Sequence, residues 1–181
     1  MLKNVLTIVA FYSACIPLQA QADRAITTFQ DMRYSNVARQ GQEPSCGAAS
    51  VATILNSEFG ESLDATDIWL RYLQTLPASD QQIALENGLS LEDIAHLVES
   101  LGYRADVVQI ELLDLASTNR PVIVYIERGG ASPFKHFLVL DRLEGTQVVL
   151  RDPVFGNRRQ RIERFVREWR GQFAVFITAR P

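Results

Sequence analysis

Cys46 is the residue in this chain best placed to act as a nucleophile. It lies in the segment 40–50, directly before an apolar run with a helical pattern. A thiol attacks a carbonyl carbon as the thiolate, and a helix N-terminus and a nearby imidazolium both favour that form. The position of Cys46 supplies the first of these conditions. The simpler interpretation is that Cys46 is a buried packing residue, so the case for chemistry depends on its partners.

The imidazole has to come from one of two histidines, His96 and His136. His96 falls beside Glu92 and Glu99, on the charged side of a predicted helix. His136 begins a predicted strand and has a carboxylate, Asp152, within reach of a predicted hairpin. A carboxylate partner fixes the tautomer of an imidazole and orients its ring. The pattern therefore favours His136 as the base.

The expected hairpin is the reason for pairing His136 with Asp152. The segments 135–140 and 147–152 are rich in β-branched and apolar residues, and they are separated by a turn at 143–146. A hairpin folded about Glu144 and Gly145 places His136 opposite Asp152 across the ladder. Pro153 then ends the strand, because proline cannot donate to a ladder.

A cysteine nucleophile also needs donors for the oxyanion that forms on the attacked carbonyl. A side-chain amide just upstream of the thiol, together with a backbone N–H at the helix start, would serve. Gln40 and Gln42 both stand there, and spacing alone does not choose between them.

Residues 1–22 are predicted to be an export signal. They contain Lys3, an apolar stretch at 5–14, and small residues at positions 20 and 22 that suit a signal peptidase. Cleavage would remove Cys15 and leave one domain, 23–181, with Cys46 as its only cysteine. A lipoprotein signal that retains an acylated Cys15 is the alternative. We therefore expect a periplasmic or secreted protein with an unpaired thiol.

Composition excludes several other classes of function. The formal charge of −3 gives no reason to expect nucleic acid as a partner. One mature cysteine and two histidines lack the spacing of metal ligands, so neither a metal nor another cofactor is expected. Beyond the signal, no apolar stretch is long enough to predict a membrane span.

The periodicity predicts an α+β domain with helices first and strands after. A helix is expected at 47–59, ending at Gly60, and a second at 62–76, stopped by Pro77. After a polar loop, Ser90 opens a third helix with a capping box. Strands are expected at 104–108, 122–127, 137–141, 148–152 and 173–178.

Six arginines follow Asp152 within a short stretch: Arg158, Arg159, Arg161, Arg164, Arg167 and Arg170. The expected structure is a solvated helix face that balances nearby acids. The alternative is a docking surface for an acidic partner.

Several segments together resemble cysteine peptidase family 39, the bacteriocin-processing or double-glycine leader peptidases. The resemblance runs from about residue 34 to the end, through the segments 40–55, 88–103, 121–123, 136–140 and 152–153, then Phe165, 169–171 and the last strand. The family has a glutamine six residues before its cysteine and an aspartate sixteen after its histidine. These intervals select Gln40 over Gln42 and match His136 to Asp152.

The resemblance implies a papain-like fold, with a central helix that bears the nucleophile packed on an antiparallel sheet that bears the base. It implies cleavage of a peptide bond after a Gly-Gly or similar small pair. Cys46 would attack, His136 would carry the proton, Asp152 would orient His136, and Gln40 would bind the oxyanion with the Cys46 N–H.

The chain departs from the family pattern in two respects. Ser45 stands where the family often has aspartate. Many relatives also belong to an exporting ABC transporter, whereas this sequence shows no P-loop motif and is predicted to carry its own export signal. The resemblance thus implies a free-standing exported protease, with a secreted fibre or amyloid subunit or a secretion-system component as its protein partner.

Two other functions compete with an active endopeptidase. One is a module of the same fold that binds a substrate or partner without cutting it. The other is a different acyl transfer on a papain-like triad, such as that of a cell-wall amidase or a transglutaminase.

Overall fold

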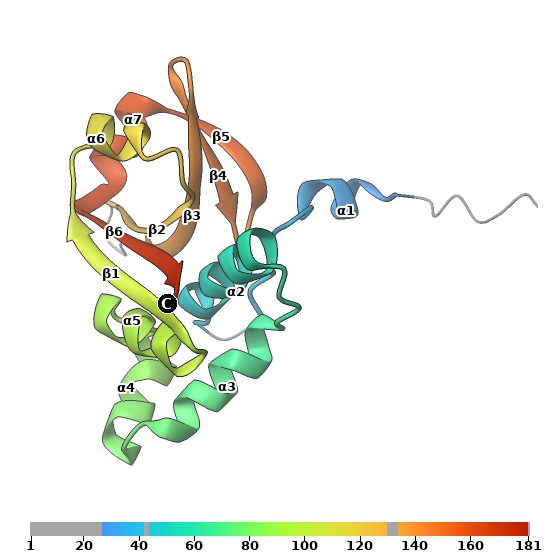
Figure 1. Cartoon of the computed structure of the whole chain (residues 1–181), viewed down its shortest axis with the longest axis vertical. Coiled ribbons are helices and arrows are strands. Elements are labelled where there is room, and N and C mark those ends of the chain that lie inside the picture. The colour runs from blue at the N-terminus through green and yellow to red at the C-terminus, as the bar shows by residue number, and fades with distance from the viewer. Residues whose placement is uncertain (1–26, 42–43, 130–133, 181) are drawn as a thin grey trace, which may run out of the picture.

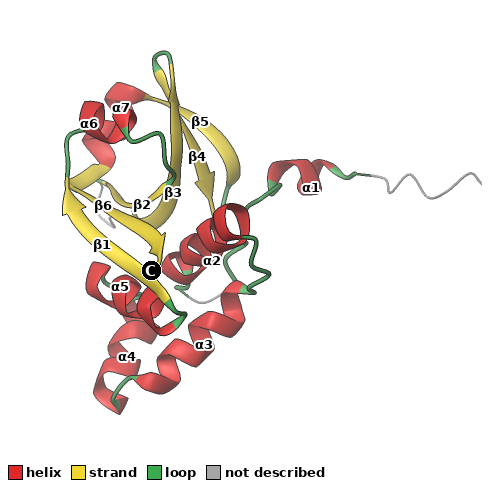
Figure 2. Ribbon diagram, viewed as in Figure 1, coloured by secondary structure: helices red, strands yellow, loops and turns green. Residues whose placement is uncertain are grey.

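The computed structural model describes residues 27–41, 44–129 and 134–180. The expected export signal with Cys15, and Gln42, lie outside the described residues. Helices α2 to α5 gather at one end of the molecule, and the strands lie at the other end together with α6 and α7 (Figures 1 and 2). The α+β prediction is confirmed.

Helix α2 (Cys46–Phe59) is the buried centre of the helical part. Residues Gly47 to Leu55 are all buried, because small side chains let neighbouring elements approach closely. A Cβ atom on Gly47 would lie 3.2 Å from Cδ1 of Ile94 in α5 (Leu91–Ser100). The helix ends as predicted at Gly60, which has the positive φ of 74° that favours glycine.

The other helices of this part of the molecule, α3 to α5, follow the sequence with two differences. Helix α3 (Ala65–Thr75) begins at Ala65, three residues later than predicted, directly after its N-cap Asp64. The expected polar loop is wrong, because residues Ala78–Asn87 form helix α4. Its residues are mostly good helix formers, but only Ala84 is buried, so no apolar stripe marks it in the sequence. Helix α5 begins with the predicted capping box, formed by Ser90 and Asp93.

In the described part of the chain, six strands form one antiparallel sheet in the order β1-β6-β2-β3-β4-β5. The five predicted strands are present, extended at one or both ends. Their bounds are β1 (Tyr103–Gln109), β2 (Val122–Arg128), β3 (Phe134–Glu144), β4 (Gln147–Asp152) and β6 (Trp169–Ala179). The short helices α1 (Phe29–Arg33), α6 (Leu112–Ser117) and α7 (Ile162–Glu168) were not predicted.

The sheet is covered on both faces, which explains the continuous apolar runs in its strands. Ile123, Phe137 and Val139 share one core with α2, α3 and α5. Val124, Leu138 and Leu150 alternate with them into a second core, where Leu115 of α6 and Phe165 of α7 pack. The ladder from β2 to β4 is therefore fixed from both sides, and the ends of its strands are rigid positions for functional side chains.

The predicted register of the β3–β4 hairpin is wrong. Leu140 lies opposite Leu150 and Val139 opposite Arg151, so one further step would place Asp152 opposite Leu138 and not His136. The ladder shifts at a bulge, where Asp141 is the extra residue on β3. If the register near the turn continued without a shift, Asp152 would lie opposite Val139, and His136 and Asp152 would point to opposite faces. With the shift at the bulge, they become diagonal neighbours on one face.

The arginine run is not the single helix face that we expected. Arg158, Arg159 and Arg161 lie on a strand, β5 (Gly156–Arg161), which pairs with β4. Arg164 and Arg167 lie on α7, and Arg170 lies on β6. Charged residues are common on an edge strand such as β5, and they obscured its β character in the sequence.

In the residues that the structure describes, no helix is both long enough and apolar enough to cross a membrane.

Gly156, just after β4, provides a test of the close packing of α1 against this part of the chain. Its φ is 72°, and a Cβ atom there would lie 2.4 Å from the backbone oxygen of Arg33. Gly145 also has a positive φ, of 58°, but a Cβ atom there would meet nothing within 4 Å. We expect Gly145→Ala to lower the free energy of unfolding by about 1 kcal/mol, the cost of the backbone conformation alone. Gly156→Ala should cost at least about 2 kcal/mol, because the clash adds to that cost. Urea unfolding measures both, and equal losses would contradict this packing.

Candidate active site

Cys46 is the first residue of α2, and its thiol is partly buried. The N-terminus of a helix carries a partial positive charge that favours an anion there. The backbone N–H of Phe137 in β3 also donates to the Sγ atom of Cys46 at 3.5 Å. The sulfur thus lies at a helix end and within reach of a strand amide.

His136 and Asp152 meet at the ends of β3 and β4, as the sequence predicted. Nε2 of His136 lies 2.8 Å from Oδ1 of Asp152, and their side chains are 2% and 0% exposed. Because Asp152 is ionised, Nε2 carries the proton and donates it to this bond. That leaves Nδ1 as the ring nitrogen for Cys46.

The charge on His136 is set by its two neighbours. Burial lowers the pKa of His136, but the hydrogen bonds and charges of Asp152 and Cys46 raise it by more, to about 9. At neutral pH the imidazole is therefore protonated. A proton on His136 beside Cys46 is what a thiolate–imidazolium pair requires.

Asp152 is held from four directions. Its Oδ1 atom also accepts hydrogen bonds from the backbone N–H groups of Val154 (3.0 Å) and Phe155 (3.1 Å). Its Oδ2 atom accepts one from Nε of Arg158 at 2.8 Å. Burial raises the pKa of Asp152, but His136, Arg158 and the Val154 amide lower it to about 2. Asp152 is thus a fixed anion that orients His136.

Arg158 is the part of this site that sequence reasoning missed. The sequence pattern predicts a solvated helix face for it, whereas it lies on β5 and contacts the buried carboxylate. Its position in the sequence gave one usable signal, since an arginine six residues after the aspartate could return on a paired strand. Arg158 touches neither the thiol nor the imidazole and acts through Asp152, so it is a positioning residue.

Gln40 is brought to the same place by a backbone contact. Its N–H donates to the carbonyl of Pro153 at 3.1 Å, directly after Asp152. The side chains of Gln40, Cys46 and His136 line one cleft of about 440 Å³. The cleft lies between the helical part and the sheet, and its other walls include Ile83, Asn87, Leu89, Ser90, Asp93, Tyr125, Lys135, Phe137 and Val154.

The structure thus brings together the four predicted site residues, Gln40, Cys46, His136 and Asp152. His96 is exposed on α5 and does not line the cleft. Among the described residues, no three His, Cys, Asp or Glu side chains gather in a way that could hold a metal ion.

Residues 34–181 match the model of the peptidase C39 family. The chain belongs to the peptidase C39 family. The match covers both the helical part and the sheet, so the domain is a cysteine peptidase domain of that family, with the papain-like fold that the resemblance implied.

The chain matches part of one relative's sequence and nearly the whole of a solved peptidase domain. It is 34% identical over 154 residues to a protein of Pseudomonas aeruginosa named "Probable functional amyloid protease FapD", and it spans 65% of that protein's length and 84% of its own. Among solved structures, it is similar in fold to the peptidase domain of Streptococcus ComA, with a TM-score of 0.63, 22% identity, and coverage of 80% and 98% of the two chains.

A second solved structure of the same fold holds a peptide. It is a double glycine motif protease from an AMS/PCAT transporter, in complex with its leader peptide. The TM-score is 0.55 and the identity 20%, over 80% of this chain and 91% of the other.

The pair of His136 and Asp152 predicts a pH dependence of stability. The folded-state pKa of His136, about 9, lies above its ordinary value of 6.5. The proton on His136 therefore stabilises the fold fully below pH 6.5, and this contribution is lost as the pH rises through 9. The difference in unfolding free energy between wild type and His136→Gln should shrink by up to about 3 kcal/mol over that range. Urea unfolding at several pH values measures it, and a constant difference would contradict the assigned charge.

The contact between Arg158 and Asp152 predicts a change in the pH at which the protein unfolds in acid. Asp152 stabilises the fold above its ordinary pKa of 3.8, and this contribution is lost as the pH falls through its folded pKa of about 2. Removing the guanidinium with Arg158→Gln raises that folded pKa, so acid unfolding followed by circular dichroism should begin at a higher pH. Arg159→Gln is the matched control, because Arg159 pairs with the exposed Glu144. Equal midpoints in the two variants would show that Arg158 does not hold Asp152.

Proposed function

We propose that this protein is an exported cysteine endopeptidase that cuts after a Gly-Gly-like small pair in a secreted or surface protein. The observation that carries the proposal is the buried hydrogen bond between His136 and Asp152, beside a cleft that His136 lines together with Cys46 and Gln40. Residues 1–22 act as its export signal and 23–181 as the peptidase domain. The localisation is periplasmic or secreted.

The first half of the reaction forms an acyl-enzyme. The Cys46 thiolate attacks the scissile carbonyl carbon and forms a C–S bond, while the carbonyl electrons move to oxygen. The side-chain amide of Gln40 and the Cys46 backbone N–H hold this oxyanion. The first N–H groups of a helix have no acceptor within the helix, so the Cys46 N–H can donate to the oxyanion. His136 gives its Nδ1 proton to the leaving amine as the C–N bond breaks.

The second half releases the product. Neutral His136 now takes a proton from water, and the resulting hydroxide attacks the thioester. The C–S bond breaks and the thiolate and imidazolium are restored. Throughout, Asp152 stays ionised and keeps Nε2 protonated, so the ring presents Nδ1 to the reaction.

The walls of the cleft support a preference for small residues at the scissile bond. Phe137 contacts the sulfur through its backbone N–H, and its ring packs against Tyr125 with a centroid distance of 5.1 Å. Two aromatic rings therefore stand beside the nucleophile in the cleft. Such walls exclude large substrate side chains by steric conflict.

The comparisons support the proposal at the level of substrate class. The double glycine protease of the same fold binds a leader peptide, and the relative from Pseudomonas aeruginosa is named as a functional amyloid protease. For this chain we propose a fibre or amyloid subunit, or a component of its secretion system, as the protein that is cut.

Cleavage of a fluorogenic peptide containing Gly-Gly tests the proposal. We expect Cys46→Ala to abolish cleavage and Gln40→Ala to lower kcat by about 10²- to 10³-fold, because one oxyanion donor is lost. Gln82→Ala, on the exposed face of α4, is the matched control and should cleave at the wild-type rate. Replacing the second glycine of the peptide by leucine should block cleavage by steric conflict. A wild-type protein that binds the peptide without cutting it would overturn the endopeptidase proposal in favour of a binding module.

A further inference from the structure

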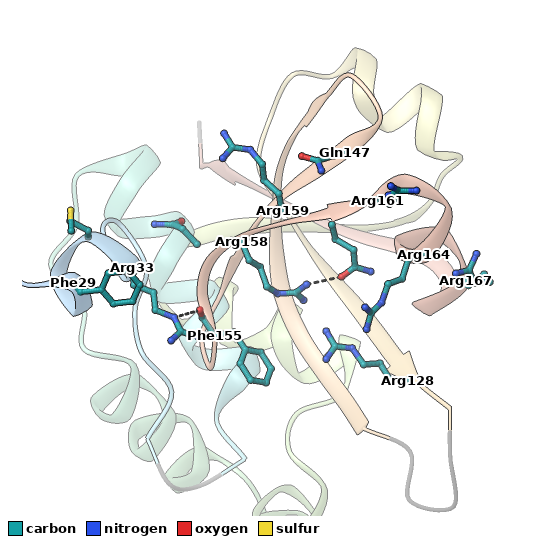
Figure 3. A pocket seen from close by; sticks show the side chains of 13 residues that line it. Phe29, Arg33, Arg128, Gln147, Phe155, Arg158, Arg159, Arg161, Arg164 and Arg167 are labelled. Carbon is teal, nitrogen blue, oxygen red and sulfur yellow. Dashed lines mark hydrogen bonds between the residues drawn. The ribbon is translucent and has the colours of Figure 1, made fainter.

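A second hollow lies beside the turn that follows β4. It has a volume of about 1040 Å³ and is lined by α1, the turn, β5 and α7 (Figure 3). Seven of its lining residues are arginines and none is an acid. Five come from the run 158–167, and Arg33 and Arg128 complete the set. We call this hollow the arginine groove.

The arginine groove keeps an excess of positive charge after its internal pairing. Arg158 pairs with Asp152, Arg159 with Glu144, and both Arg128 and Arg164 pair with Glu168. Within the described part of the chain, Arg33, Arg161 and Arg167 make no ion pair, and the buried Nη2 atom of Arg158 has no hydrogen-bond acceptor. Seven arginines face only three paired acids here, and like charges in excess repel one another, so this surface is suited to an anionic ligand.

The positive charge belongs to the groove and not to the chain as a whole. The chain has a formal charge of −3, and residues 46–100 hold nine acidic side chains against one arginine. A long polyanion lying across the molecule would meet this acidic part. The charge distribution therefore favours a short acidic ligand over a nucleic acid.

The groove also offers apolar surface. Phe29 is 75% exposed, Met32 58% and Phe155 37%. Phe29 and Arg33 lie at one end, Arg164 and Arg167 at the other, and Phe155 between them (Figure 3). A ligand with both carboxylates and apolar side chains, which is an acidic polypeptide segment, matches such a surface.

One tight turn separates the arginine groove from the catalytic cleft. Val154 lines the cleft and the next residue, Phe155, lines the groove. The N–H groups of both residues donate to Asp152, and Arg158 in the groove contacts the same carboxylate. A single extended polypeptide can thus occupy the cleft and continue into the groove.

We propose that the arginine groove docks an acidic segment of the same protein whose peptide bond is cut at Cys46. This inference rests on the proposed function for the identity of that protein. The groove selects substrates by charge at a distance from the scissile bond, while the aromatic walls of the cleft select the small residues at it.

Binding can be measured apart from cleavage in the full chain carrying Cys46→Ala. The probe is a fluorescein-labelled peptide of about twelve residues with five Asp or Glu, one Phe and no Gly-Gly pair, followed by fluorescence anisotropy. The triple variant Arg161→Gln, Arg164→Gln, Arg167→Gln should bind the probe about tenfold more weakly, since several exposed charge pairs are lost. The control triple Arg71→Gln, Arg104→Gln, Arg180→Gln changes the net charge equally outside the groove and should bind normally.

Further binding measurements distinguish an acidic peptide from other ligands of the groove. A peptide with Asn and Gln in place of the acids should not bind, and added salt should weaken binding of the acidic probe. Equal loss in both triple variants would reduce the effect to net charge and overturn the proposal. Tighter binding of single-stranded DNA of the same charge would also overturn it. So would self-association of the full chain that the groove triple abolishes, because a second copy would then fill the groove.

Cleavage assays distinguish failure of this inference from failure of the proposed function. If wild type cuts Gly-Gly peptides, joining the acidic segment to the peptide should lower KM about tenfold, and the groove triple should lose that gain. Cleavage without any such gain overturns the docking proposal alone. Probe binding in the groove without any cleavage overturns the endopeptidase proposal alone.

Discussion

The buried carboxylate of Asp152 is the interaction on which the site depends. An ionised group with no exposed surface is tolerated only when its oxygens are fully paired, and here a histidine, an arginine and two backbone amides do this. These partners come from β3, β5 and the turn after β4. Pairing one anion therefore fixes three segments of chain, and with them the orientation of His136.

The nucleophile reaches this network from the other part of the molecule. Cys46 stands at the start of α2, whose small, buried residues pack against α5 and the sheet. The contact between Phe137 and the Cys46 sulfur joins the helical part to β3 beside His136. Helix packing thus decides where the thiol lies, and strand pairing decides where its base lies. The cleft forms where the two parts meet, and the sheet is held on its other face by a second core with α6 and α7.

The sequence predicted which residues form the site better than it predicted the strand register that positions them. His136 and Asp152 were paired through a hairpin register that is wrong, and they meet because a bulge at Asp141 restores the same face. Asp141 forms ion pairs with Arg142 and Arg151, which hold the extra residue on the ladder. Such a bulge has no signature in a period-two pattern, since it depends on pairs formed across strands. Helix α4 and strand β5 were missed for a related reason, because neither buries a regular apolar stripe.

The sequence by itself determined the α+β class, the buried helix that begins at Cys46, and the residue types and spacing that the C39 family shares. These are local properties, set by periodicity, capping and turn chemistry. Only the tertiary structure decided that Arg158 holds Asp152, that Phe137 donates to the sulfur, and that the arginines gather in a groove one turn from the cleft. Those facts depend on β5 returning beside β4 and on α1 packing beside Gly156. They arise from contacts between segments distant in the chain, which no local pattern encodes.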